Sequence, residues 1–247
     1  MMNLRRSMLE SYWAMQRVIA PTLKYSQYLY EDVLKAHVGP NTVWLDIGCG
    51  HQVLPIWRLK EEQRLASQCK LLAGIDYDMQ SLKKHRNLHY KVRGSVSSLP
   101  FRDNSFNLVT ANMVIEHLDN PEEQFREIAR ILKPEGVFIF HTPNARGYTT
   151  RLARLIPEGL KVRLIYLLDG RKEVDIFETH YRANTRKSIE DLSQRTDFKE
   201  VKVKMIASDA AFSVIPPLAL LELCWIRLLM TKPFAPLRTN IIAILKR

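Results

Sequence analysis

Cysteine and clusters of metal-binding side chains are scarce in this sequence of 247 residues. The three cysteines, Cys49, Cys69 and Cys224, lie far apart and form no Cys-x-x-Cys pair. A disulfide framework or a zinc site would need more Cys or His residues at short spacing. The sequence therefore predicts a protein of a reducing compartment, the cytoplasm, and it predicts no metal site.

A hydrophobic run long enough to cross a membrane is also missing. The first residues carry charges and contain no apolar run of the length found in signal peptides. The most apolar stretch, residues 210–230, is interrupted by Pro216 and Pro217, and only 13 of its residues follow them. A spanning helix needs about 20 mostly apolar residues, so we expect no transmembrane helix.

Glycine and proline, at 9 and 12 residues, are too few for a collagen-like or low-complexity chain. The 46% of hydrophobic and 26% of charged residues suit a globular protein with a sizeable core. The net charge of +11 is uneven: residues 36–143 hold 13 basic and 12 acidic side chains, whereas residues 144–187 and 199–247 each carry a net +5. Binding to nucleic acid or to an anionic membrane is therefore expected to involve the second half of the chain.

Apolar segments of strand length alternate with segments of helical periodicity. Strands are predicted at residues 42–48, 71–76, 89–95, 106–112, 136–143, 200–207 and 240–247. Helices are predicted at residues 8–37 with a break at Pro21, at 53–69, at 79–86 with Asp78 as cap, from Pro121 with Asn120 as cap, and at 185–195 with Thr185 as cap. This alternation predicts an α/β fold in which helices cover both faces of a parallel sheet.

The first predicted strand ends in an acidic residue and two glycines, in the sequence DIGCG (46–50). Glycines at this turn let the backbone approach a ligand closely. The dinucleotide fingerprint would need a third glycine where the chain has Val53, so that motif is absent. Asp76, at the end of the second strand, is placed to accept hydrogen bonds from a ribose diol. Together these residues favour a nucleoside ligand that carries an amino group and no phosphate.

Four stretches resemble the class I S-adenosylmethionine-dependent methyltransferases, of the broad type 11 kind. They are VWLDIGCG (43–50), GIDYD (74–78), SSLPFRDNSFNLVTANMVIEHL (97–118) and REIARILKPEGVFIFHTPN (126–144). The resemblance implies a Rossmann-like seven-stranded sheet, mostly parallel with an antiparallel last strand, and helices on both faces. It also implies a single methyltransferase domain over residues 1–247, made of a helical cap (1–40), a cofactor-binding core (41–144), a basic insert (145–184) and a C-terminal part (185–247) with an apolar insert (208–238).

The resemblance further implies S-adenosyl-L-methionine as the cofactor and assigns residues to it. The residues expected to line this cofactor are Asp46, Gly48, Cys49 and Gly50 beside its methionine moiety, Asp76 at its ribose, Tyr77, Ser95 and Val96 at its adenine, and Asn112 and Met113 at the end of the fourth strand. Many members of the family carry an Asp at the position of Ser95, so this adenine contact is expected to be weaker here.

Methyl transfer needs a nucleophile aligned with the methyl carbon, and a general base where that nucleophile must lose a proton. His117, in the loop after the fourth strand, is the preferred catalytic base, and His141 and His51 are the other candidates. A purely structural role for Glu116 and His117 in that loop is an equally weighted alternative. NMVI (112–115) stands where enzymes that methylate amino groups of DNA bases often carry Asn/Asp-Pro-Pro-Tyr, which argues against that activity.

Two segments outside the predicted core are expected to contact the acceptor or a partner. The basic insert mixes leucines and isoleucines with Arg146, Arg151, Arg154, Lys161 and Arg163. This composition suits an anionic membrane surface, and equally a lid packed on its own domain. Residues 210–230 are too apolar for an ordinary surface helix and favour a membrane interface, a homodimer contact or a cover over the active site. HYRAN (180–184) is expected either to face the substrate or to join its loop to the sheet.

The sequence thus favours an S-adenosylmethionine-dependent methyltransferase of the cytoplasm, attached peripherally to the inner membrane face. Its expected acceptor is a small molecule or a lipid-linked compound, methylated at oxygen or carbon. Two other hypotheses stay open: an RNA methyltransferase, because of the basic charge, and a non-catalytic subunit that binds the cofactor. Nucleic acid is the less favoured partner, because the predicted cofactor-binding part is nearly neutral.

Overall fold

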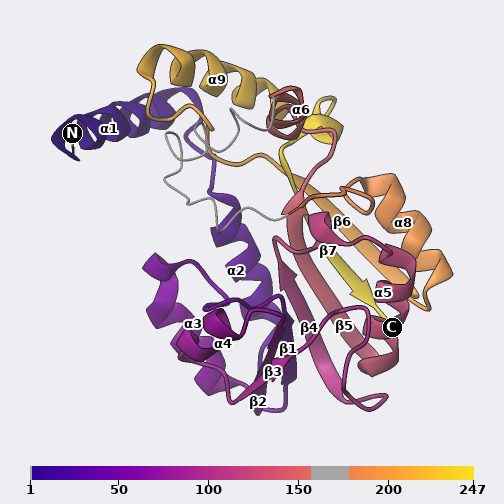
Figure 1. Cartoon of the computed structure of the whole chain (residues 1–247). Helices are drawn as coiled ribbons and strands as arrows, with labels where there is room; N and C mark the ends of the chain where they lie inside the picture. The colour runs from indigo at the N-terminus through magenta and orange to yellow at the C-terminus, as the bar shows by residue number, and fades with distance from the viewer. Residues whose placement is uncertain (1, 157–177) are drawn as a thin grey trace. The chain divides into compact units, whose positions relative to one another are not determined.

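The computed structural model describes residues 2–156 and 178–247, with side chains from Arg5 onward (Figure 1). The chain divides into two compact units. The helical unit comprises Met1–Ser26, Pro143–Glu178 and Met205–Asn240, and the sheet unit comprises Gln27–Thr142, Thr179–Lys204 and Ile241–Arg247. The division into a single domain with four parts stays a prediction. Within the basic insert, the predicted contacts of Lys161 and Arg163 lie outside the described residues.

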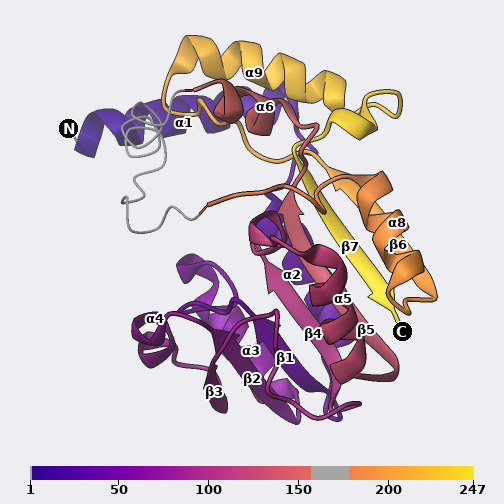
Figure 2. The ribbon, with the colours of Figure 1, turned by 45° about the vertical axis from the view of Figure 1, so that its right-hand side comes forward.

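Within the described residues, seven strands form one sheet in the order β3-β2-β1-β4-β5-β7-β6 (Figures 1 and 2). The strands are β1 Val43–Ile47, β2 Leu71–Asp76, β3 Tyr90–Arg93, β4 Phe106–Asn112, β5 Leu132–Pro143, β6 Glu200–Ile206 and β7 Asn240–Lys246. The first five of these strands pair in parallel with one another. The central strands are buried along most of their length, as a parallel sheet covered on both faces requires.

Strand β7 runs antiparallel to β5. Near the start of β5, Arg247 N donates a hydrogen bond to Gly136 O at 3.0 Å, and just beyond the end of β5, Asn144 N donates to Thr239 O at 2.8 Å. The residue before β6 donates to the last residue of β7, so β7 is antiparallel to β6 as well. The predicted fold class, a mostly parallel seven-stranded sheet with an antiparallel last strand, is confirmed.

Helices cover both faces of the sheet. The helices of the sheet unit are α2 Ser26–His37, α3 Leu59–Gln68, α4 Met79–Lys84, α5 Pro121–Ile131 and α8 Arg186–Arg195. Phe125 of α5 packs edge-on against Phe138 and Phe140 of β5, whereas Tyr30 of α2 stacks on His141 of the same strand. Since successive side chains of a strand point to opposite faces, α5 and α2 lie on opposite faces of the sheet.

Two of the predicted helix caps are confirmed. The Asp78 carboxylate accepts hydrogen bonds from the backbone N–H groups of Gln80 and Ser81, at 2.9 and 3.0 Å, at the start of α4. Thr185 forms a capping box with Ser188 at the start of α8. Both side chains satisfy backbone donors that have no partner inside the helix.

Two local predictions are wrong. Asn120 stands at the N-cap position of α5 as predicted, but its side chain makes no capping hydrogen bond. The Asp119 carboxylate accepts from Asn120 N and Gln124 Nε2 at this end of the helix. The strand predicted to begin at residue 136 begins at Leu132, directly after α5, because Leu132 pairs with Phe106 of β4. Pairing with β4 therefore starts β5 before Pro134 and Gly136, although proline and glycine usually interrupt a strand.

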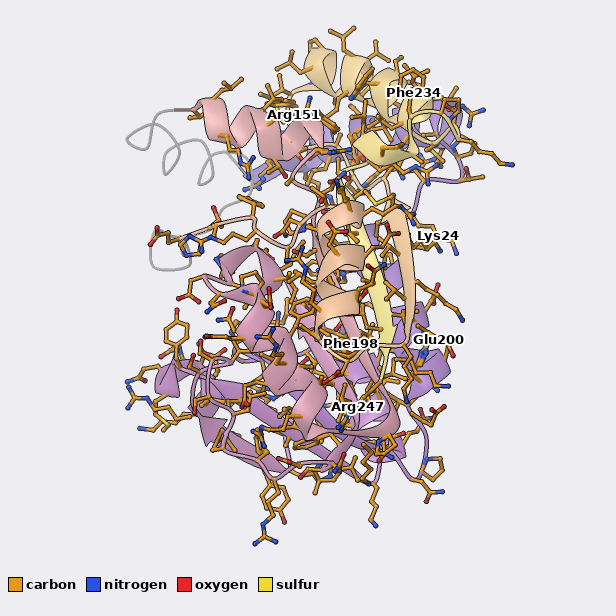
Figure 3. All side chains as sticks on the ribbon, turned by 90° about the vertical axis from the view of Figure 1, so that its right-hand side faces the viewer. Lys24, Arg151, Phe198, Glu200, Phe234 and Arg247 are labelled. Atoms are coloured by element: carbon orange, nitrogen blue, oxygen red, sulfur yellow. The ribbon has the colours of Figure 1, made fainter. Side chains whose placement is uncertain are left out.

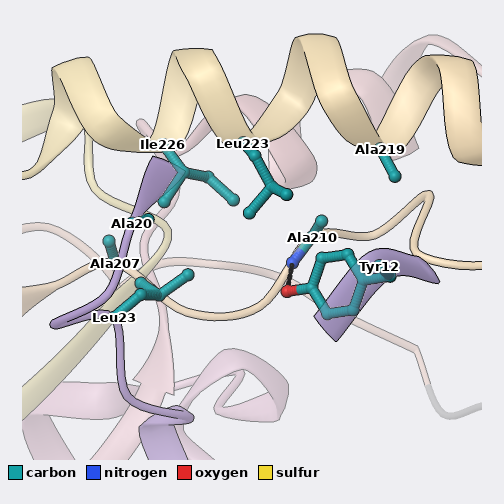
Figure 4. Close-up of a cluster of buried hydrophobic side chains, with 8 residues drawn as sticks. All are labelled: Tyr12, Ala20, Leu23, Ala207, Ala210, Ala219, Leu223 and Ile226. Carbon is teal, nitrogen blue, oxygen red and sulfur yellow. Dashed lines mark hydrogen bonds between the residues drawn. The ribbon is translucent and has the colours of Figure 1, made fainter. Parts of the chain in front are cut away.

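The helical unit is built on α1 Met2–Ile19, α6 Tyr148–Leu155 and α9 Pro216–Leu229. Its core lies between α1, α9 and the chain before α9 (Figure 4). The core side chains are Tyr12, Ala20, Leu23, Ala207, Ala210, Ala219, Leu223 and Ile226. None of the helices in the described part of the chain is long and apolar enough to cross a membrane. The predicted cytoplasmic location stays a prediction.

Candidate functional site

The loops that follow β1, β2 and β4 meet at one edge of the sheet unit. Ile47, the last residue of β1, lies opposite Ile75 of β2 and Ala111 of β4. The residues that follow these three positions are Gly48, Asp76 and Asn112. Parallel pairing of the strands therefore brings three predicted site residues side by side. Ligands of open α/β sheets bind beyond this carboxyl edge.

The glycines after β1 have backbone conformations that other residues rarely adopt. Gly48 has φ +62° and Gly50 has φ +49°. Gly48 N donates to Ile75 O at 2.8 Å, and a Cβ atom on Gly48 would collide with the side chain of Val114 in the loop after β4. Around a Cβ built on Gly50, no described atom lies within 4 Å. The loop is therefore closed toward β4 at Gly48 and open at Gly50, where a ligand can approach the backbone.

Asp76 is held in place by two backbone donors. Its Oδ2 accepts from Gly50 N at 2.9 Å, and its Oδ1 accepts from Asp78 N at 2.8 Å. Each carboxylate oxygen can accept a further hydrogen bond, and the side chain is only partly buried. Asp76 can thus fix the glycine loop and still accept hydrogen bonds from two adjacent hydroxyl groups.

Asp46 lies beneath this loop and is buried. Its carboxylate accepts a hydrogen bond from Thr110 Oγ1, which itself accepts from Trp44 Nε1 at 2.7 Å. Burial raises the pKa of Asp46 well above its ordinary value, and the nearby carboxylates of Glu62 and Asp76 raise it further. The side chain therefore belongs to the floor of the site, and its predicted contact with a methionine moiety stays a prediction. The neighbouring Cys49 is buried as well.

The predicted adenine-side residues lie in the loops after β2 and β3. Tyr77 is 58% exposed, and its carbonyl oxygen accepts from Arg93 Nε at 3.2 Å. Ser95 is exposed and forms an isolated bridge with Ser98, whereas Val96 is half-buried. These residues share the carboxyl edge with Asp76, since β2 and β3 pair in parallel.

Asn112 is a structural link. Its Oδ1 accepts from His141 Nδ1 at 2.9 Å and from Gln27 Nε2 at 3.3 Å, while its Nδ2 donates to Gln27 Oε1 at 3.0 Å and to Val53 O at 3.4 Å. The amide therefore joins α2, β5 and the loop after β1. The next residue, Met113, has φ +57° and an exposed side chain. Of this pair, Met113 is the side chain that can face a ligand.

His141 is fully buried in β5. Burial lowers its pKa to about 3, so the imidazole is neutral near pH 7. A buried ring joined to Asn112 cannot reach an acceptor, and this removes His141 from the candidate bases. His51 is exposed in the loop after β1.

His117 closes a short 3-10 turn, Ile115–His117, after β4. Its Nε2 lies 4.0 Å from Oε1 of the buried Glu116, and its side chain is 29% exposed. Glu116 Oε2 accepts from Thr142 Oγ1 at 2.9 Å, and Thr142 Oγ1 accepts from Asn184 Nδ2 at 2.6 Å. The carboxylate is thus fixed to β5 and to the chain before α8, while the imidazole beside it remains partly accessible.

HYRAN (180–184) is attached to this turn by backbone hydrogen bonds and to Asp119, just after it, by a side chain. His180 N and Tyr181 N both donate to Glu116 O, at 2.7 and 3.1 Å, and Arg182 Nη1 donates to Asp119 O. Of the two predicted roles for this segment, attachment of the loop to the sheet unit is therefore the one that these contacts support.

Two residues of the site were missed by the sequence analysis. Glu62 of α3 is buried, and its Oε2 accepts from Val53 N and Leu54 N at 2.9 and 2.8 Å. Gln27 of α2 holds Asn112, as described above. Glu62 lies in the first turn of α3 but in the middle of the helix predicted at residues 53–69, so its position in the sequence was no signal for this contact. In the described residues, no cluster of three or more His, Cys, Asp or Glu side chains is arranged to hold a metal ion.

Comparison with known proteins agrees with this geometry. Residues 45–140 match the model of a family described as a methyltransferase domain. The demethylmenaquinone methyltransferase of Corynebacterium kroppenstedtii is 34% identical over 107 residues, which cover 40% of this chain and 46% of that protein. The matched segment runs from β1 to β5 and contains the glycine loop, Asp76 and His117.

Residues 45–140 belong to the class I S-adenosylmethionine-dependent methyltransferases. The fold is similar to that of an S-adenosylmethionine-dependent methyltransferase of Mesorhizobium loti, with a TM-score of 0.56 and 17% identity. This similarity covers 87% of this chain and 96% of that chain. The ubiquinone biosynthesis O-methyltransferase of Photobacterium profundum is 25% identical over 131 residues, 47% of this chain and 53% of that protein. The chain spans about half the length of these curated relatives.

Proposed function

We propose that this protein transfers a methyl group from S-adenosyl-L-methionine to a small-molecule or lipid-linked acceptor. The observation that carries the proposal is the arrangement of the open Gly50 backbone beside Asp76, whose carboxylate is fixed and only partly buried. This arrangement lies inside the segment that matches the methyltransferase family.

The residues at the carboxyl edge suit this cofactor. Asp76 retains hydrogen-bonding capacity for a ribose diol, and the exposed ring of Tyr77 can pack on an adenine face. Gly48, Cys49 and Gly50 would pass under the methionine moiety with Asp46 below them, and Ser95, Val96, Asn112 and Met113 would complete the cofactor contacts. When bound, S-adenosylmethionine supplies an electrophilic methyl group on its sulfonium.

We assign His117 as the general base. Its imidazole is partly accessible in the turn after β4, and the buried Glu116 carboxylate lies beside it. A hydroxyl or an acidic C–H group of the acceptor must lose a proton as its nucleophilic atom takes the methyl group, and a neutral imidazole can accept that proton. Glu116, fixed by Thr142, would orient the ring and stabilise its protonated form.

The relatives support a lipid-linked acceptor. One is named for demethylmenaquinone and another for ubiquinone biosynthesis. The second is named an O-methyltransferase. We therefore propose methylation at oxygen or carbon of a ring that carries a long apolar chain. Such an acceptor requires the protein to approach a membrane.

A screen for transfer of labelled methyl tests this proposal. The full-length protein is incubated with labelled S-adenosylmethionine and with cell extract separated into lipid, RNA, protein and small-molecule fractions. Label in the lipid or small-molecule fraction is the expected result. Label in RNA would support the RNA methyltransferase alternative, which the basic charge motivates. Cofactor binding with no labelled product in any fraction would support a non-catalytic subunit.

A further inference from the structure

Helix α9 is apolar on its exposed side as well as its buried side. Its inner face, with Ala219, Leu223 and Ile226, packs into the core of the helical unit (Figure 4). The residues that point away from this core form what we call the outer face of α9, and they are Pro217, Leu218, Leu220, Leu221, Cys224, Trp225 and Leu228. Leu221 is 68% exposed. A water-exposed helix normally carries polar side chains on this side.

The charged residues of α9 do not interrupt the outer face. Glu222 points inward, where its carboxylate accepts from Tyr148 Oη at 2.6 Å and from Ala211 N and Phe212 N at 2.8 Å each. Arg227 is exposed and, at 100° per residue, lies at one margin of the outer face. An exposed apolar stripe can be buried at the boundary between lipid headgroups and acyl chains, with a cation at its edge at headgroup level.

The unit to which this stripe belongs is basic on its surface. Among the described residues of the helical unit, nine exposed side chains are basic, namely Arg5, Arg6, Arg17, Lys24, Arg146, Arg151, Arg154, Arg227 and Lys232 (Lys24 and Arg151 are labelled in Figure 3). The exposed carboxylates there are Glu10, which pairs with Arg6 at 3.0 Å, and Glu178. Arg238 is engaged elsewhere, since its guanidinium donates to carbonyl groups at the C-terminal end of α9.

The length of α9 decides how it can meet a membrane. Its 14 residues extend about 21 Å at 1.5 Å per residue, which is shorter than the ~30 Å hydrocarbon core. The helix can therefore lie along a bilayer surface but cannot span it. Trp225, at the margin of the outer face, has the amphipathic ring that favours the level of the lipid headgroups.

We propose that the outer face of α9 docks on an anionic phospholipid surface, with Arg227 at its margin and Lys232 just after the helix on the lipid phosphates. Lipid docking would bring the protein to a lipid-linked acceptor, and only this biological role rests on the proposed function. Charge selects this occupant over a second copy of the chain, because two such basic units would repel each other whereas acidic headgroups attract them.

Vesicle co-sedimentation of the full-length protein tests the proposal. The probes are vesicles of phosphatidylcholine alone and vesicles that also contain phosphatidylglycerol. We expect binding to the acidic vesicles, weakened at least ~tenfold when salt rises from about 0.1 M to about 0.5 M. Quenching of tryptophan fluorescence by brominated lipid should fall in Trp225→Phe, because this residue enters the interface.

Matched variants separate the apolar contribution to vesicle binding from the electrostatic one. Leu221→Glu with Leu228→Glu should reduce vesicle binding roughly 100-fold or more, since both leucines are expected to enter the lipid. Arg227→Glu with Lys232→Glu should reduce binding at least ~tenfold. Tyr90→Glu, and Lys187→Glu with Lys202→Glu, change exposed residues of the sheet unit and should bind like the unchanged protein.

Several outcomes would overturn the docking surface. They are no binding of the unchanged protein to acidic vesicles, equal binding by the leucine variant, or a dimer that the leucine variant converts to monomer without any lipid binding. S-adenosylhomocysteine binding is measured on every variant by calorimetry. Lipid binding without S-adenosylhomocysteine binding would contradict the proposed function and leave the docking surface supported.

Discussion

Gly48 and Gly50 both have a left-handed backbone conformation, but only Gly48 lies close to another side chain, that of Val114. Gly48→Ala places a methyl group against Val114 at φ +62°, so we expect it to lower the free energy of unfolding by about 2–4 kcal/mol. Gly50→Ala has the strained backbone without the collision and should cost about 1–2 kcal/mol. Urea unfolding measures both. Equal losses would show that the contact between Gly48 and Val114 is absent in solution.

His117 is expected to matter for turnover and not for cofactor binding. His117→Ala should lower kcat by ~10²–10⁴-fold, because the acceptor's proton loses its base, while S-adenosylhomocysteine binds as before. His51→Ala is the matched control, since His51 is an exposed imidazole in the loop after β1. A loss confined to the His51 variant would move the catalytic role to that residue. Unchanged turnover in both would show that the reaction needs neither imidazole.

The buried imidazole of His141 makes stability depend on pH. Its pKa falls from an ordinary value of 6.5 to about 3 in the folded protein, so between these values the unfolded chain binds more protons. The neutral imidazole's contribution to the free energy of unfolding is fully present above about pH 6.5. It is lost as the pH falls toward 3, by up to ~4 kcal/mol. His141→Gln should make this acid dependence shallower in urea titrations at pH 4 to 7. An identical pH dependence in both proteins would contradict the assignment.

At the scale of elements, the sequence predicts local structure better than it predicts the connections between elements. The strand ends that carry Gly48 and Asp76 follow from apolar runs closed by glycine or an acid. Asp78 and Thr185 are found as caps because capping is local in the chain. The early start of β5 and the link between Gln27 and Asn112 depend on partners 26 to 85 residues away, which no local pattern reveals.

Glu62 is the clearest element-scale test, because one side chain of α3 holds the loop after β1. Glu62→Ala would leave the buried N–H groups of Val53 and Leu54 without their acceptor, at a cost of about 1–3 kcal/mol for each. We expect lower stability together with weaker S-adenosylhomocysteine binding. Glu61→Ala, on the partly exposed neighbour that pairs with Arg64, should change stability by less than about 1 kcal/mol. Similar losses in both variants would contradict the role of Glu62.

At the scale of the whole chain, the candidate site and the apolar face of α9 belong to different units. The sheet unit carries the glycine loop, Asp76 and His117, and its matched segment is nearly neutral. The helical unit carries the apolar outer face of α9 and, among its described residues, nine exposed basic side chains. The sequence indicates both the apolar stretch and the basic excess, but not that Glu222 turns inward and leaves the exposed side of α9 apolar, because this depends on Tyr148 and on the chain before α9.

Calorimetric titration of S-adenosylhomocysteine into the full-length protein tests the central claim most directly. We predict one site per chain, and affinity at least ~tenfold weaker for Asp76→Ala, because its carboxylate holds Gly50 N and, by our proposal, would also hold the ribose. Tyr90→Glu should bind like the unchanged protein. No binding to the unchanged protein, or equal binding by Asp76→Ala, would contradict the assignment of this edge as the cofactor site.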